Sequence, residues 1–217
     1  MGLLRRGGAR TNETAALLLM LAGSTVLMGI ITAEALFPGE YNTGDHTVSS
    51  LASTFQPGDD VREPSATIFN LTMIVSGLMI AAGAYLLSGY GRALPIALGV
   101  LGVAVFLVGL FPGEVVDGEP STEGVHPIVA LLAFLGGPIG AILTARVTRA
   151  PFRYLSAAFG AICLVALFSS GALGDTSLGE GGVERWVVYP IVLWLLAFGG
   201  YVLGTSPTSA NQPEIRR

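Results

Sequence analysis

Long apolar stretches alternate with short polar ones along the whole chain. A helix needs about 20 mostly apolar residues to cross the hydrocarbon core of a bilayer. Six stretches approach that length, at residues 14–36, 67–87, 93–111, 127–145, 152–173 and 186–203. The pattern therefore predicts an all-α fold, a polytopic membrane bundle of six transmembrane helices.

The polar segments between these stretches predict how the rest of the chain is organised. Residues 14–204 are expected to form the membrane domain, preceded by a segment at 1–13 and followed by a disordered polar tail at 205–217. The connection at residues 37–66 is the longest, and loops of this length often carry function. Within it, residues 47–52 are expected to form a short helix capped by Asp45.

The composition supports a membrane protein and excludes several kinds of site. The chain is 52% hydrophobic and only 12% charged, whereas soluble domains carry about 25% charged residues. A single cysteine, Cys163, excludes a disulfide within the chain. Two histidines without a CxxC or HExxH spacing predict no metal site. Without a phosphate-binding glycine loop or a basic surface, we expect no cofactor and no nucleic-acid partner.

Charge predicts the orientation of the bundle in the plasma membrane. Two arginines, Arg62 and Arg185, flank the helices on one side, and nine lie on the other: Arg5, Arg6, Arg10, Arg92, Arg146, Arg149, Arg153, Arg216 and Arg217. Because positive charge favours the cytoplasmic side, both termini are predicted to be cytoplasmic. The outward loops then carry twelve carboxylates, here called the acidic rim: Glu40, Asp45, Asp59, Asp60, Glu63, Glu114, Asp117, Glu119, Glu123, Asp175, Glu180 and Glu184. The absence of lysine beside these carboxylates fits a salt-adapted proteome, although arginine codons in a high-GC genome give the same bias.

The first apolar stretch has a second interpretation, as a cleaved signal peptide. It follows an arginine-rich start and ends near Ala33-Glu34-Ala35, which resembles a cleavage site. Its apolar core, residues 15–32, exceeds the 7–15 residues usual for such a peptide. We therefore expect the stretch to be retained as a transmembrane helix.

A short motif recurs and suggests an internal repeat. Phe37-Pro38-Gly39-Glu40 ends the first stretch, and Phe111-Pro112-Gly113-Glu114 ends the third. An acidic loop, a histidine and another apolar stretch follow each copy. The chain is either three related helical hairpins or a set of chance matches among Gly- and Leu-rich runs. Gly-rich helix faces also allow self-association or contact with another membrane protein, beside the contact with the lipid bilayer.

The side chains that could carry chemistry gather at the predicted outer ends of the helices. They are His46, Asn70, His126, Asp175, Glu184, Arg185, Trp186, Tyr189 and Trp194. Arg185 lies on the arginine-poor side, so we expect it to bind a carboxylate of another loop, for which the candidates are Glu40, Glu114 and Asp175. Trp186 and Tyr189 fit an aromatic belt at the membrane surface.

The remaining polar residues of the helices and loops each have an expected partner or two possible roles. Trp194 lies deeper, where its indole N–H needs an acceptor. His46 and His126 either share an outward site for a proton or a metal, or are separate interfacial residues. Asn70 is expected to join two helices, and Glu34 to reach the headgroups.

Several of these residues resemble one family. Pro64, Phe69 and Asn70 form one element of the resemblance, and the turn 111–113 followed by His126-Pro127 forms another. The run from Gly181-Gly182 through Glu184-Arg185-Trp186 and Tyr189-Pro190 to Trp194 is the most specific element. Together they resemble the domain-of-unknown-function family numbered 998, from the first span to Tyr201. The resemblance implies a multi-span prokaryotic membrane protein and supplies no catalytic residues.

Three classes of function remain open. The first is a non-enzymatic sensor, scaffold or assembly factor, in which Arg185 is a structural clasp. The second is an intramembrane enzyme acting on a lipid or isoprenoid, with His46, His126, Asp175 and Arg185 as its polar set and a pocket near Arg185 and Trp194. The third is a small transporter, which the scarcity of charges within the apolar stretches disfavours.

Overall fold

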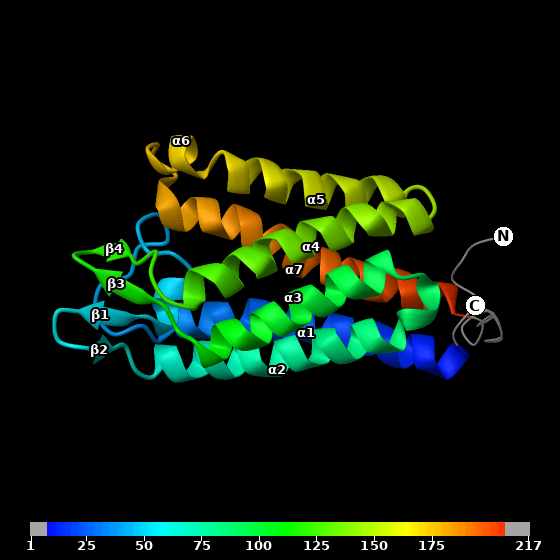
Figure 1. Cartoon of the computed structure of the whole chain (residues 1–217), viewed down its shortest axis with the longest axis horizontal. Helices are drawn as coiled ribbons and strands as arrows, with labels where there is room; N and C mark the ends of the chain where they lie inside the picture. Colours follow the sequence, from blue (N-terminus) through cyan, green and yellow to red (C-terminus); the bar gives the residue numbers. More distant parts are fainter. Residues whose placement is uncertain (1–7, 207–217) are drawn as a thin grey trace, which may run out of the picture.

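The protein is a bundle of antiparallel helices with a small cap at one end (Figure 1). The cap consists of the connections at residues 36–64, 111–125 and 169–178. The computed structural model describes residues 8–206. Within this range it has seven α-helices: α1 (Ala9–Ala35), α2 (Ser65–Leu86), α3 (Ala93–Leu110), α4 (His126–Val147), α5 (Phe152–Phe168), α6 (Ser170–Gly174) and α7 (Gly179–Thr205). Two 3₁₀ helices, η2 (Ser49–Ala52) and η3 (Ser88–Tyr90), lie in connections.

Five helices, namely α1, α2, α3, α4 and α7, are long and apolar enough to cross a membrane. The sixth predicted span, residues 152–173, is different. Its helix α5 ends at Phe168 after 17 residues, or about 26 Å of rise against about 30 Å of hydrocarbon. Serine and glycine at 169–171 are weak helix formers, and the short helix α6 follows this interruption. The structure therefore has five long apolar helices and one shorter one in place of the six predicted transmembrane helices.

The helices form a closed ring. Each packs on the next in the order α1, α2, α3, α4, α5 and α7, and α7 returns to α1. Small residues make some of these contacts possible, because an added Cβ at Gly77 of α2 would lie 2.3 Å from the Phe106 nitrogen of α3. By contrast, Gly200 and Gly204 of α7 face open space. Helix α1 is thus an integral member of the ring.

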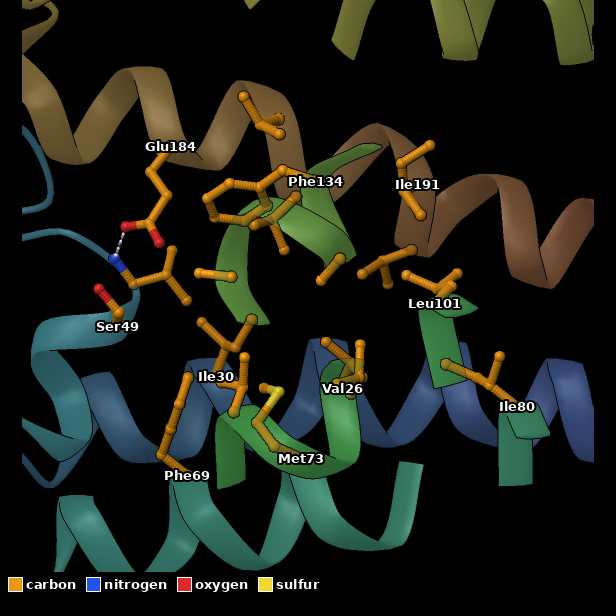
Figure 2. Close-up of a pocket in the computed structure, with 18 of the residues that line it drawn as sticks. Val26, Ile30, Ser49, Phe69, Met73, Ile80, Leu101, Phe134, Glu184 and Ile191 are labelled. Atoms are coloured by element: carbon orange, nitrogen blue, oxygen red, sulfur yellow. Dashed lines mark hydrogen bonds between the residues drawn. The ribbon is translucent and has the colours of Figure 1, made fainter. Parts of the chain in front are cut away.

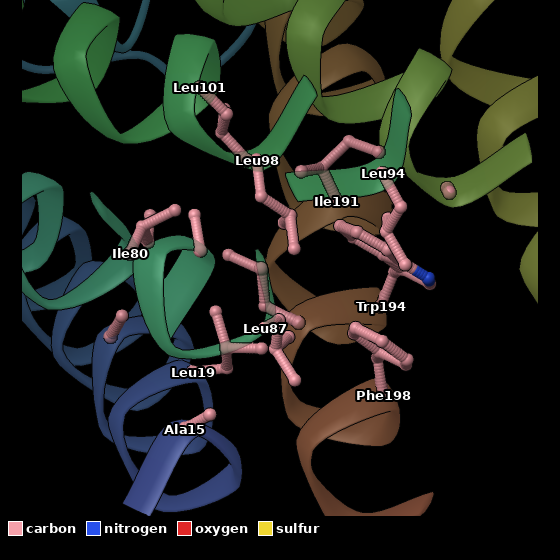
Figure 3. Close-up of a cluster of buried hydrophobic side chains, with 14 of the residues drawn as sticks. Ala15, Leu19, Ile80, Leu87, Leu94, Leu98, Leu101, Ile191, Trp194 and Phe198 are labelled. Atoms are coloured by element: carbon pink, nitrogen blue, oxygen red, sulfur yellow. The ribbon is translucent and has the colours of Figure 1, made fainter. Parts of the chain in front are cut away.

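The half of the bundle farther from the cap has an apolar core (Figure 3). Trp194 and Phe198 of α7 stack with ring centroids 5.5 Å apart, and Leu19 of α1 and Leu98 of α3 are fully buried in the same cluster. Large apolar side chains also cover the outside of the bundle: Leu17, Leu21, Met28, Leu71, Leu78, Ile96, Val103, Ile128, Val165 and Phe168 are all exposed. An apolar surface of this extent is stable when lipid surrounds it.

The cap contains a small sheet that the all-α prediction missed. Its strands are β1 (Thr54–Gln56), β2 (Asp60–Val61), β3 (Glu114–Val116) and β4 (Glu119–Pro120), in the order β2-β1-β3-β4. Strands of two or three residues leave no alternation of polar and apolar positions to detect. Asp117 and Gly118 both have positive φ, as a tight hairpin turn requires.

The cap also bears on the proposed repeat. A strand hairpin leads into α2 and another leads into α4, and their first strands, β1 and β3, pair in parallel. Helix α6, rather than a hairpin, stands between α5 and α7. Two of the three units therefore share one arrangement, and the third differs from them.

The two ends of the bundle carry opposite charge. The first residues of α1 and the last of α7 lie at the end away from the cap (Figure 1). The described arginines at or near that end are Arg10, Arg92, Arg146, Arg149 and Arg153. The residues of the acidic rim lie in the cap and at the neighbouring ends of α6 and α7. The predicted disordered tail, apart from Thr205 and Ser206, lies outside the described residues.

Candidate functional site

Arg185 joins three segments at the cap end of the bundle. It lies near the start of α7 and is 8% exposed. Its Nη2 lies 2.6 Å from the Glu34 carboxylate at the end of α1, and its Nε also donates to Glu34. Its Nη1 donates to the carbonyls of Thr43, His46 and Gly181, at 2.9, 2.8 and 2.8 Å. All three guanidinium nitrogens are therefore bound within the chain.

The partner of Arg185 differs from the prediction. The sequence pointed to Glu40, Glu114 or Asp175 in the outer loops, and Glu34 was expected to reach the headgroups. Glu34 instead lies in the last turn of α1 and faces α7, which brings its carboxylate to Arg185. We call Arg185, Glu34 and the loop of residues 41–46 the arginine clasp.

Tyr41 completes the arginine clasp. Its hydroxyl accepts a hydrogen bond from Nη2 of Arg185 and lies 3.5 Å from Glu34. Its ring stacks on His46, with centroids 5.1 Å apart, and contacts Phe37. Burial raises the pKa of the Tyr41 hydroxyl well above its ordinary value, so this group stays neutral beside the ion pair.

Glycine allows the loop to reach α7. An added Cβ at Gly181 would lie 2.2 Å from the His46 carbonyl oxygen and 2.7 Å from that of Thr43. The Gly181 N–H donates to the Gly44 carbonyl at 2.8 Å. Gly179, which has positive φ, approaches Gly44 just as closely. The glycines before Arg185 therefore provide the space in which the loop carbonyls meet the guanidinium.

Glu184 points away from Arg185, into the bundle. Its carboxylate accepts a hydrogen bond from the Val48 N–H, at the start of η2 (Figure 2). A carboxylate at this position satisfies free backbone N–H groups of a helix start. The predicted short helix therefore exists as η2 but begins at Ser49, and Glu184 of α7 caps it. Asp45, the predicted cap, instead accepts a hydrogen bond from Asn42.

An apolar cavity of about 90 Å³ lies inside the bundle below Glu184 (Figure 2). Its walls include Val26, Ile30, Met73, Leu101 and Ile191, from α1, α2, α3 and α7. Glu184, Ser49 and His126 contribute the polar atoms at one end. A cavity with such walls offers a charged solute no partners along its length.

His126 begins α4 beside the turn at residues 111–113. Its Nδ1 lies 2.8 Å from the Phe111 carbonyl oxygen, and Gly113 packs on its ring. Its Nε2 is buried, and no hydrogen-bond partner for it is present among residues 8–206. The ring borders both the internal cavity and a surface cleft of about 390 Å³ that Glu114 and Glu123 also line.

The two histidines occupy different positions in their hairpins. His126 is the first residue of α4, whereas the first residue of α2 is Ser65. His46 lies far upstream of α2, where its ring stacks on Tyr41 and its Nδ1 lies 3.3 Å from the Asn42 carbonyl. No hydrogen bond or ring stacking joins the two imidazoles in the described part of the chain, and no group of three metal-binding side chains occurs there.

Trp186 and Tyr189 line a groove on the side of the bundle, which we call the lateral groove. It measures about 700 Å³ and lies between α5, α7 and the loops at residues 42–44 and 177–178. Trp186 is 53% exposed, as an aromatic belt residue is expected to be. Arg185 contributes to the same wall.

Trp194 does not line the lateral groove. It is fully buried, and its indole N–H donates to Ser156 of α5 at 2.8 Å. The Ser156 hydroxyl in turn donates to the Ala141 carbonyl of α4 at 2.8 Å. Trp194 therefore has the acceptor that the sequence required, and it connects three helices away from Arg185.

Two further predicted site residues, Asn70 and Asp175, also stand apart from the arginine clasp. Asn70 packs its backbone closely on Gly109 of α3, and its buried Oδ1 has no hydrogen-bond partner within the described range. Asp175 follows α6 and is exposed.

Sequence reasoning missed Tyr41 and Ser156 as partners and undervalued Glu34. The one signal for Glu34 was a carboxylate within a helix that contains no other charge after Glu13.

Comparison with known proteins identifies a family and no activity. A family model described as "Protein of unknown function (DUF998)" matches residues 20–201. No curated protein and no solved structure matches the chain.

Proposed function

Because the chain belongs to the DUF998 family, which is described as of unknown function, we propose its role from its own geometry. It is a non-enzymatic membrane protein that presents a rigid, acidic cap to a partner, as a sensor, scaffold or assembly factor. The observation that carries the proposal is the internal use of Arg185, whose three nitrogens all bind groups of the same chain. The buried arginine of the cap thus serves the fold.

The exposed carboxylates of the acidic rim, without Glu184, which caps η2, are the part of the cap left for recognition. The two strand hairpins and the residues that directly follow them carry exposed carboxylates: Asp59, Asp60, Glu63, Glu114, Asp117, Glu119 and Glu123. A surface of one charge that a sheet holds in place attracts and orients a basic partner.

The orientation follows from the charge of the two ends. We infer that the arginine-rich end, with both termini, faces the cytoplasm and that the cap faces outward in the plasma membrane. The acidic rim then meets partners outside the cytoplasm.

Cysteine labelling tests this orientation. Cys163 is fully buried, and Cys163→Ala gives a cysteine-free protein. Single cysteines are then introduced at Asp59 and Arg149. A membrane-impermeant maleimide added to intact cells is expected to label Asp59→Cys, and to label Arg149→Cys only after the membrane is opened. Labelling of both positions in intact cells contradicts the proposed orientation.

Site-specific photo-crosslinking tests the proposed function. A photoreactive residue at Glu119 on the cap is expected to yield one discrete heterologous product, whereas the same residue at Leu71 on the lipid-facing side of α2 is expected to yield none. Neutralising Asp59, Asp60, Asp117 and Glu123 together should abolish that product and leave thermal stability within a few degrees, because exposed charges contribute little to folding. An unchanged product in the neutralised variant, or none from any cap position, contradicts the proposal.

The two alternatives receive less support. Of the four polar residues proposed for a lipid-directed enzyme, only Arg185 borders the lateral groove, and Trp194 does not border it. For a transporter, the internal cavity offers polar atoms only at its end beneath the cap. Transport paths for charged solutes are usually marked by charges within the membrane.

A further inference from the structure

The lateral groove changes in polarity along its length. Phe159 and Ile162 of α5 and Leu193 of α7 form one part of its wall. Asn42, Thr43 and Ser177, from loops at the cap end, form the other part. The groove therefore passes from an apolar zone between two membrane helices to a polar lip at the membrane surface.

The apolar zone lies on the outside of the bundle, where we expect lipid to surround the apolar helices. Ile162 and Leu193 are 40% and 45% exposed, and both lie within apolar helices. Water in such a space lacks hydrogen-bond partners, and an empty groove loses dispersion contacts. A hydrocarbon chain from the surrounding membrane satisfies both conditions.

The polar lip selects the headgroup. Arg185 borders the groove, but Glu34 neutralises its charge and its nitrogens are already bound. Asn42 at the lip donates a hydrogen bond to the exposed carboxylate of Asp45, which leaves negative charge beside the groove. The acidic rim adds charge of the same sign. An anionic headgroup is therefore disfavoured, and an amine is favoured.

We propose that the lateral groove binds a membrane lipid, with one hydrocarbon chain between α5 and α7 and an amine-bearing headgroup at Asn42 and Asp45. Of the acidic rim, this site uses Asp45 alone, which lies outside the two strand hairpins that carry the proposed partner surface. Either proposal can therefore fail without the other.

Tryptophan fluorescence can report on this site directly. The chain has two tryptophans; Trp186 lines the groove, and Trp194 is fully buried beside Ser156. The protein is reconstituted in phosphatidylcholine vesicles that contain brominated phosphatidylethanolamine or brominated phosphatidylglycerol at equal mole fraction. We expect about two- to fivefold stronger quenching of Trp186 by the ethanolamine lipid. One exposed ion pair raises the binding affinity by about that factor. A Trp186→Phe variant supplies the signal of Trp194 for subtraction.

Three variants separate the bound lipid from bulk lipid. Ile162→Phe narrows the groove and is expected to reduce quenching, whereas Val165→Phe, on α5 but outside the groove wall, is expected to leave it unchanged. Asp45→Asn is expected to remove the preference for the ethanolamine lipid. Equal quenching by both lipids in the unmodified protein, or stronger quenching by the glycerol lipid, overturns the headgroup assignment. Quenching that Ile162→Phe and Val165→Phe affect equally overturns the chain site.

Discussion

Replacing Arg185 with methionine is expected to lower the free energy of unfolding by about 3–5 kcal/mol, the usual cost of removing one partner of a buried ion pair. The substitution leaves the Glu34 carboxylate, which is 18% exposed, without its cation. It also removes the donor from the carbonyls of Thr43 and His46. The measurement is reversible unfolding in mixed micelles, followed by circular dichroism.

The other arginine of the cap provides the matched control. Arg62 lies over the Phe55 ring, 4.9 Å from its centroid, and forms no ion pair in the described part of the chain. Arg62→Met is therefore expected to cost less than about 1 kcal/mol. If Arg185→Met and Arg62→Met lower the free energy of unfolding equally, the arginine clasp has no specific stabilising role.

Replacing Gly181 with alanine is expected to be the second most damaging change, at about 1–3 kcal/mol, the usual range for overpacking. The new Cβ meets the carbonyl oxygens of His46 and Thr43, which are backbone atoms and cannot rotate away. The loop must move, and the acceptors of Arg185 move with it.

A second glycine on the same helix controls for helix propensity. Gly200→Ala adds a Cβ in open space, so it is expected to leave stability unchanged or raise it by up to about 1 kcal/mol. The same unfolding measurement compares the two variants. A loss at Gly200 as large as the loss at Gly181 contradicts the steric explanation.

The long helices were predictable because their signal is local. Lipid demands about 20 apolar residues wherever a helix crosses it, so composition alone located α1, α2, α3, α4 and α7. The fifth span was overestimated, since residues 169–173 are apolar or small enough to extend the stretch while serine and glycine interrupt the helix. The strands β1 to β4 were not predicted because each has only two or three residues and because β1 pairs with β3, about 60 positions away.

The site was predictable in its residue types and not in its pairings. An arginine on the arginine-poor side had to have a carboxylate, and it does. Which one depends on how α1 and α7 pack, and a single sequence does not encode that packing in any local pattern. For the same reason the cap of η2 came from Glu184, which is 136 residues away from Val48, and not from Asp45 nearby.

The pairing of α1 with α7 through Arg185 and Glu34 is the central claim, and a double-mutant cycle tests it most directly. The free energies of unfolding of Arg185→Met, Glu34→Gln and the double variant are measured under one set of conditions. If the two side chains form a structural clasp, the double variant should be less destabilised than the sum of the single variants, with a coupling energy of about 1–3 kcal/mol. Additive losses, within about 0.5 kcal/mol, contradict the arginine clasp as the element that holds the cap.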